Sequence, residues 1–214
     1  MVGGRAQASA PLSPVIADQL RAVKFARLKS ATKSVREAAA TPHLFTQIRQ
    51  PSTEYLVVPE VTSGRRKYIP IGFLPPTVIA SNKLYTIPGR DIFIFGVLES
   101  IVHMAWMRVI TGRFGDGYMY SPSVYNNFPW IERSARIEQT AQAILDARAR
   151  YPDRSLASLY DDQKMPDDLR AAHAANDKAV LEAYGFPIDL NESEIVSRLM
   201  TMYQQLTIRS DAGN

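Results

Sequence analysis

The chain has 214 residues, 46% of them hydrophobic and 21% charged, which is typical of a globular protein with one large domain or two small ones. It contains no cysteine, which excludes disulfide scaffolds and cysteine-rich zinc sites and favours a cytoplasmic location. Residues 1–130 carry 15 Lys+Arg against 7 Asp+Glu, whereas residues 131–214 carry 10 against 14. This asymmetry predicts that the first part faces a polyanion, although a solvated basic surface would show the same charge.

The first predicted element is a helix over residues 15–39, which carries six Lys or Arg between Arg21 and Arg36. From Glu54 the pattern changes to short β-rich runs that are separated by turn-forming residues. These runs span residues 55–58, 67–71, 77–80 and 84–87. They predict a small, mostly antiparallel sheet.

A long apolar stretch follows the sheet. Asp91 is placed to cap a helix that continues to about Thr111, where Gly112 ends it. The apolar run is long enough to suggest a membrane span, but Glu99, His103 and Arg108 interrupt it, so we expect a buried core helix and no membrane partner.

The aromatic stretch over residues 124–130 is interpreted as a boundary, because the sequence after Trp130 is helical in pattern. Helices are predicted over residues 134–150, 166–184 and 192–206. The predicted fold class is therefore α+β: a small, mostly antiparallel sheet with a long buried helix in domain 1–130, followed by an α-helical domain at 131–214.

Two motifs have the outline of catalytic or nucleotide-binding sequences. Asn127-Phe128-Pro129-Trp130 is similar to the Asn-Pro-Pro-aromatic motif of amino-methyltransferases, but Phe stands at its second position and no glycine-rich cofactor loop precedes it. A packed aromatic boundary is the favoured interpretation.

The glycine-rich run 112–117 lacks the features of a phosphate loop. It is interpreted as a turn that presents Arg113 and Asp116 to a partner, and a plain helix end with a tight turn is compatible with the same residues.

The basic run Arg65, Arg66 and Lys67 lies in a predicted hairpin turn, next to Tyr68. Contact with DNA phosphates is the preferred interpretation, and a solvated turn is the alternative. His43, His103 and His173 show no metal-ligand spacing, so no metal site is expected. The acidic pairs at 161–162 and 167–168 are interpreted as structural.

Several segments, in the same order along the chain, closely resemble the sequences of one protein family. They are residues 65–74, 103–108, 112–113, 120–121 and 125–130 in the first part, and residues 159–161, 165–166, 172–173, 176–177 and 183–185 in the second. The first group resembles the target-recognition domain of MmeI-like DNA methyltransferases and type IIL restriction-modification enzymes. The second group resembles the helical C-terminal domain of the same family.

The resemblance implies a parent enzyme that methylates adenine N6 with S-adenosylmethionine. The family places base-specific residues in the turn after the long helix, which here contains Gly115, Asp116, Gly117 and Met119. The family's catalytic and cofactor-binding motifs belong to a preceding domain and do not occur here. We therefore expect no catalytic or cofactor-binding residue in this chain, and we leave open whether it alone is an enzyme.

The expected site is accordingly a double-stranded DNA contact formed by Arg65, Arg66, Lys67, Arg113, Gly115, Asp116, Gly117 and Met119. The expected second partner is a methyltransferase catalytic domain, in cis or in trans. The alternative function is a subunit-docking module that has no DNA affinity of its own.

Overall fold

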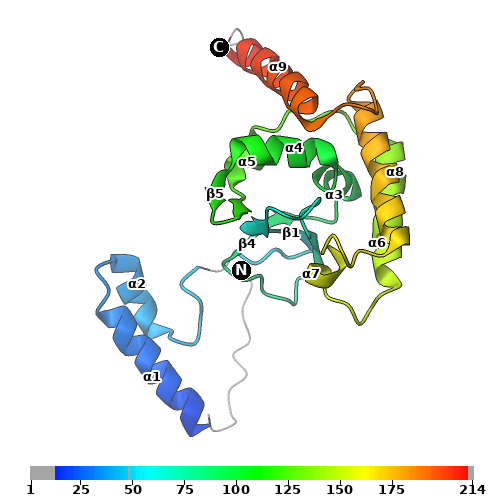
Figure 1. Cartoon of the computed structure of the whole chain (residues 1–214). Helices are drawn as coiled ribbons and strands as arrows, with labels where there is room; N and C mark the ends of the chain where they lie inside the picture. Colours follow the sequence, from blue (N-terminus) through cyan, green and yellow to red (C-terminus); the bar gives the residue numbers. More distant parts are fainter. Residues whose placement is uncertain (1–12, 48, 212–214) are drawn as a thin grey trace. The chain divides into compact units, whose positions relative to one another are not determined.

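A computed structural model describes residues 13–47 and 49–211 of the chain. The chain divides into two compact units, residues 1–49 and residues 50–214, and each is described by itself (Figure 1).

The N-terminal unit contains two helices and a short 3-10 turn: α1 (Pro14–Leu28), α2 (Lys33–Glu37) and η1 (Ala38–Ala40). The single helix expected over residues 15–39 is therefore broken. The Arg36 guanidinium donates hydrogen bonds of 2.8 Å to the carbonyls of both Ser30 and Ala31, which holds the chain in a turn between the helices. Arg27 likewise donates to the carbonyls of Ala38, Thr41 and Leu44, so these two arginines stabilise the unit's own backbone.

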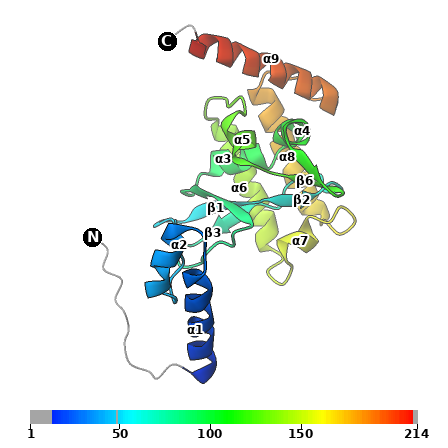
Figure 2. The ribbon, with the colours of Figure 1, turned by 90° about the vertical axis from the view of Figure 1, so that its left-hand side faces the viewer.

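The larger unit contains two three-stranded antiparallel sheets. The first has the order β3-β1-β4, formed by β1 (Tyr55–Pro59), β3 (Gly72–Leu74) and β4 (Leu84–Pro88). The second has the order β2-β6-β5, formed by β2 (Val61–Ser63), β5 (Gly112–Phe114) and β6 (Gly117–Met119). Figure 2 shows β2 and β6 side by side.

Two of the expected strands differ from the structure. Residues 67–71 and 77–80 lie outside the strands, and β3 begins only at Gly72. Pro70 has no backbone N–H to donate to a ladder, and Pro75 and Pro76 precede the second segment. The apolar residues of the first segment are nevertheless buried, because they pack under neighbouring helices.

The long core helix is present but bent. It consists of α3 (Ile92–Leu98) and α4 (Ile101–Ile110), whose axes differ by 63°. Asp91 caps α3 as predicted, by accepting a hydrogen bond from the Ile94 amide, and Ser100 caps α4 by accepting one from His103. Because Ser100 caps a second helix inside the apolar run, the predicted helix is divided into α3 and α4.

The bent pair lies in the core. No single described helix is long and apolar enough to cross a membrane; α3 and α4 together have the length and composition for it. Phe95, Val97 and Trp106 are completely buried, which confirms the expected core helix.

The remaining helices are α5 (Pro122–Asn126), α6 (Ala135–Ala149), α7 (Leu156–Leu159), α8 (Asp167–Ala183) and α9 (Glu192–Asp211). The three predicted C-terminal helices correspond to α6, α8 and α9, and α7 is an additional short one. Helices α6 and α8 lie side by side, α6 also packs on α3, and α9 packs on α4 (Figure 1). One hydrophobic core extends from Leu56 to Leu199 and so includes side chains from both sides of Trp130.

Candidate nucleic-acid interface

The two turns singled out from the sequence meet at one end of the β2-β6-β5 sheet. Ser63, the last residue of β2, is paired with Gly117, the first residue of β6. The Gly64 amide then donates a hydrogen bond of 3.1 Å to the Asp116 carbonyl. The turn between β5 and β6 contains Gly115 with φ of +56°, a left-handed conformation that favours glycine. Residues about 50 positions apart in the sequence thus form one continuous surface.

Most of the predicted contact residues are accessible on this surface. The side chains of Arg65, Arg113 and Asp116 are exposed, and that of Arg66 is half-buried. The Arg113 guanidinium lies over the ring of Tyr118, 4.2 Å from its centroid, and this contact restrains its direction.

Three of the predicted contact residues are not freely exposed side chains: one is buried, one is partly exposed and one is in an ion pair. Gly117 is buried between β2 and β5, and a Cβ there would lie 2.7 Å from the Thr62 carbonyl oxygen, so only its backbone is available. Met119 is 37% exposed on the outer face of the sheet. The ammonium of Lys67 lies 3.8 Å from the Asp177 carboxylate, away from the other two cations of its run.

The arginines at these turns lack carboxylate partners. Within residues 50–208, six arginines and no lysine have no Asp or Glu oxygen within 4.0 Å; they are Arg65, Arg66, Arg113, Arg136, Arg154 and Arg198. The last three contact Gln139, backbone carbonyls and the ring of Phe186, respectively. The first three gather at the two turns. An unneutralised group of arginines is suited to contact with phosphates or guanine edges.

Exposed apolar side chains lie on one face of this sheet, opposite the face that carries Arg113 and its cross-strand partner Tyr118. The register places Val61, Phe114 and Met119 on the outer face of the sheet, where they are 41%, 62% and 37% exposed. The sequence reasoning did not select Phe114, although it lies between Arg113 and Gly115. Exposed apolar groups beside arginines can contact thymine methyl groups or the faces of bases.

A loop from the helical part lies opposite the basic turn. Asp161, Asp162 and Gln163 share with Ser63, Arg65 and Arg66 a polar hollow of about 420 Å³. The two carboxylates pair instead with Lys164 and Arg170, which agrees with a structural role for this acidic pair. Sequence reasoning could not place this loop here, because nothing local links residues 63–66 to residues 161–163.

The other hollows are less suited to a polyanion. One, of about 610 Å³, is lined by Arg90 and Arg133, and both are already paired with carboxylates. Another, of about 400 Å³, is mainly apolar and is lined by Tyr85, Tyr120 and Tyr125. The unpaired arginines therefore distinguish the end of the β2-β6-β5 sheet.

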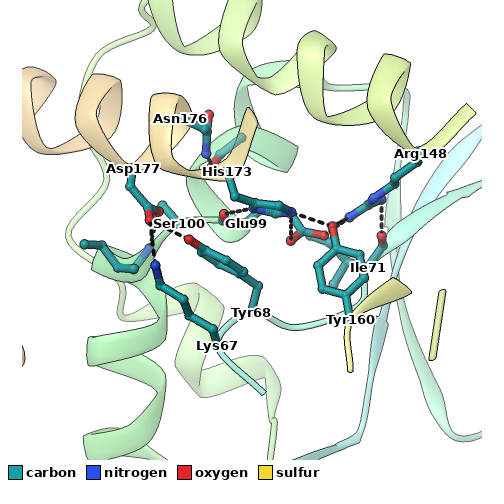
Figure 3. A network of polar contacts seen from close by, with 12 residues as sticks. Lys67, Tyr68, Ile71, Glu99, Ser100, Arg148, Tyr160, His173, Asn176 and Asp177 are labelled. Carbon is teal, nitrogen blue, oxygen red and sulfur yellow. Dashed lines mark hydrogen bonds and ion pairs between the residues drawn. The ribbon is translucent and has the colours of Figure 1, made fainter. Parts of the chain in front are cut away.

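A buried polar network lies beneath the basic turn (Figure 3). The Arg148 guanidinium forms an ion pair with Glu99, donates to the Tyr160 hydroxyl, and donates a hydrogen bond of 2.8 Å to the Ile71 carbonyl. Burial raises the pKa of Glu99 to about 7, against the opposing effect of Arg148. Burial also lowers the pKa of His173 to about 3, so its imidazole is neutral.

The second half of this network reaches the turn directly. The Tyr68 hydroxyl donates a hydrogen bond of 2.6 Å to Asp177, and the ring of Tyr68 stacks on His173 with 4.0 Å between centroids. Asp177 also accepts from the Ile101 amide at 2.9 Å. Burial raises the pKa of Asp177 to about 6. From the sequence, His173 and Asp177 belong to a predicted helix and to segments of family resemblance, and neither is expected in a polar network.

The aromatic stretch before the helical part packs into the core. Phe128 is buried against Trp106 and His103, and the indole of Trp130 donates a hydrogen bond of 3.1 Å to the Tyr125 carbonyl. This packing agrees with the interpretation of residues 127–130 as a packed aromatic stretch. Among the residues that the structure describes, no group of three His, Cys, Asp or Glu side chains could hold a metal ion.

Small antiparallel sheets and a helical part share one core in this chain, and comparison with known proteins identifies its family. The family described as the MmeI target recognition domain matches residues 3–132, and the MmeI C-terminal domain family matches residues 132–209. The chain belongs to the MmeI target recognition domain family and carries the C-terminal domain of the same proteins.

Longer relatives agree with this assignment. The chain is 35% identical over 202 residues to DNA methyltransferase A of Bacillus subtilis (strain 168); the match covers 92% of this chain and 23% of that protein. It is also similar, with a TM-score of 0.84 and 45% identity, to a solved structure of the type IIL restriction-modification enzyme MmeI in complex with DNA. That match covers 91% of this chain and 27% of the other, so this chain spans about a quarter of the length of each relative.

Proposed function

We propose that this chain is the sequence-specific DNA recognition module of an adenine-N6 DNA methyltransferase or restriction-modification enzyme. The observation that carries the proposal is the group of Arg65, Arg66 and Arg113, which have no carboxylate partner and lie at one end of a sheet. The MmeI structure, which shares this fold at 45% identity, is a complex with DNA. The partner proposed for this surface is therefore double-stranded DNA.

The residues of this surface are suited to two different kinds of DNA contact, with phosphates and with base edges. Arg65 and Arg66 are on a turn outside the strands, where cations can contact the phosphate backbone and set the register on the duplex. Arg113 is restrained by Tyr118, and a fixed guanidinium can donate two hydrogen bonds to a guanine edge. The exposed Asp116 can accept from a cytosine amino group.

The methyl transfer is assigned to other residues. S-adenosylmethionine is the cofactor proposed for the parent enzyme, and none of this chain's residues is proposed to bind it. A catalytic domain, in cis or in trans, is the proposed protein partner. The chain's contribution is to select the DNA site and hold it.

The test is to change Arg65, Arg66 and Arg113 together to alanine in the whole chain and to measure binding of labelled duplex DNA over a range of salt concentrations. Each lost phosphate contact reduces the slope of log affinity against log salt by about 0.9. The matched control changes the exposed residues Arg136, Arg150 and Lys178 to alanine, which removes the same charge away from the turns. Equal losses in the two variants would contradict the proposal, and a wild-type chain that does not bind the duplex would favour the alternative of a docking module without DNA affinity.

A further inference from the structure

The segment that carries the basic turn is held mainly by side chains from other elements. Residues 64–71, between β2 and β3, lie outside the strand ladders. The Arg66 carbonyl accepts a hydrogen bond of 3.2 Å from Arg108 of α4, and the Ile71 carbonyl accepts one of 2.8 Å from Arg148 of α6. Tyr68, between these two points, is 2% exposed and packs on α8. The Arg66 amide closes the turn itself by donating to the Ser63 carbonyl at 3.2 Å, and the contacts from α4, α6 and α8 hold the rest of the segment.

Asp177 of α8 forms the central attachment (Figure 3). Its carboxylate accepts from the Tyr68 hydroxyl at 2.6 Å and lies 3.8 Å from the Lys67 ammonium. It also accepts from the Ile101 amide at 2.9 Å, which fixes the carboxylate against the start of α4. Adjacent residues of the turn segment are therefore attached through one carboxylate to the rigid helix pair α4 and α8.

We propose that Asp177 is a positioning residue for DNA recognition: it contacts no DNA and sets the orientation of Arg65 and Arg66 through Lys67 and Tyr68. This inference rests on the proposed function and adds to it a residue of the helical C-terminal part. A turn ordered before binding loses less conformational entropy when its arginines engage phosphate. The role assigned to Asp177 is to provide that order.

Because Asp177 is negatively charged, electrostatics and positioning predict opposite changes in DNA affinity when it is replaced. A carboxylate near the interface repels DNA, so its removal by Asp177→Asn would strengthen binding if only long-range electrostatics mattered. Positioning predicts the opposite sign: Asp177→Asn weakens binding. Tyr68→Phe removes the hydroxyl, keeps the stacked ring and leaves the charge unchanged, and it is expected to weaken binding as well.

The experiment measures the affinity of the whole chain for a labelled duplex of mixed sequence, at a temperature where thermal melting shows every variant to be folded. We expect Asp177→Asn and Tyr68→Phe to weaken binding by about threefold or more. The control is Asp168→Asn, also on α8, whose partners are Tyr151, Arg150 and the Leu169 amide. This control makes the same charge change and is expected to bind equally well or more tightly.

Double variants distinguish an effect of Asp177 on the basic turn from a general loss of stability. If Asp177 acts through the basic turn, changing Arg65 and Arg66 to alanine costs less affinity in the Asp177→Asn background than in the wild type. The cost of Arg113→Ala, in strand β5, is expected to be the same in both backgrounds. Additive losses for both turns, or unweakened binding by both Asp177→Asn and Tyr68→Phe, would overturn the inference alone. A wild-type chain that does not bind duplex DNA would overturn the proposed function and this inference with it.

Discussion

The backbone amide of Gly64 is hydrogen-bonded to the carbonyl oxygen of Asp116, and a Cβ added to Gly64 would lie 2.3 Å from that oxygen. This contact joins the basic turn to the turn between β5 and β6. The two turns therefore approach each other as closely as two backbones can, and only glycine permits it.

The variant Gly64→Ala is accordingly expected to force the two turns apart. Overpacking against a backbone atom costs about 1 to 3 kcal/mol of unfolding free energy, and DNA affinity should fall because the arginines no longer form one surface. The control is Gly112→Ala in β5, where no atom lies within 4 Å of the added Cβ. Urea denaturation and duplex binding of the two variants check this. Equal stability and affinity of both variants would contradict the role of the close approach.

Arg113 and Phe114 are adjacent, exposed and chemically different, so they are expected to contribute differently. Arg113→Ala should reduce the salt dependence of binding if its guanidinium contacts phosphate, or relax base preference at one position if it contacts a guanine edge, at about 1 to 3 kcal/mol. Phe114→Ala should leave the salt dependence unchanged and alter the preferred sequence or the affinity. Selection from a randomised duplex pool, with binding measured at several salt concentrations, distinguishes these results. A changed salt slope in Phe114→Ala would argue against an apolar contact.

The buried ion pair of Arg148 and Glu99 is expected to be sensitive to the loss of one partner. Their side chains are 8% and 0% exposed, so Arg148→Met leaves a carboxylate in the core without its cation. The expected cost is about 3 to 5 kcal/mol of unfolding free energy. The double variant Glu99→Gln with Arg148→Met removes the charge and should recover part of that loss. Denaturant unfolding of both variants measures it, and a double variant less stable than Arg148→Met would contradict the explanation.

His103 is expected to make the chain sensitive to acid. It is fully buried, its Nε2 lies 3.1 Å from the Tyr120 hydroxyl oxygen, and burial lowers its pKa to about 3 from the ordinary 6.5. Between these two values the unfolded chain binds a proton that the folded chain does not, so stability falls as the pH falls. The contribution is about 1.4 kcal/mol per pH unit.

The measurement compares unfolding free energies from pH 7 to pH 4 in the wild type and in His103→Gln. The variant cannot titrate at this position, so its stability should decline less steeply by that amount. Other titrating groups, including Asp177 and Glu99, are common to both proteins and cancel in the difference. His43→Gln, at an exposed histidine, is the control and should follow the wild type. Parallel curves for the wild type and His103→Gln would refute this prediction.

The elements that could be predicted from the sequence are those set by local patterns. Helices α6, α8 and α9 follow from their helical spacing, and β1 and β4 from β-branched and aromatic runs between turns. The capping role of Asp91 was also evident. The Ser100 cap was not, because Ser100 lies inside a long, mainly apolar run that predicts a single helix.

The site could be predicted only in pieces. The arginines of both turns were recognisable as charge and turn signals, but the pairing of β2 with β6 joins three-residue strands about 50 residues apart. Strands this short have almost no periodicity of their own. Asp177 resembled any helical acid, since nothing local indicates that Tyr68 and Lys67 reach it from a different part of the chain.

The hydrogen bond between Tyr68 and Asp177 spans 109 residues of sequence, and this separation has a consequence for synthesis. A chain emerging from the ribosome exposes its basic turn well before α8 exists to hold it. Contacts between distant residues also form late in folding, because a long loop must close first. We therefore expect the surface proposed to contact DNA to become ordered only after α8 has been made, so that a chain interrupted before α8 carries the arginines without their arrangement.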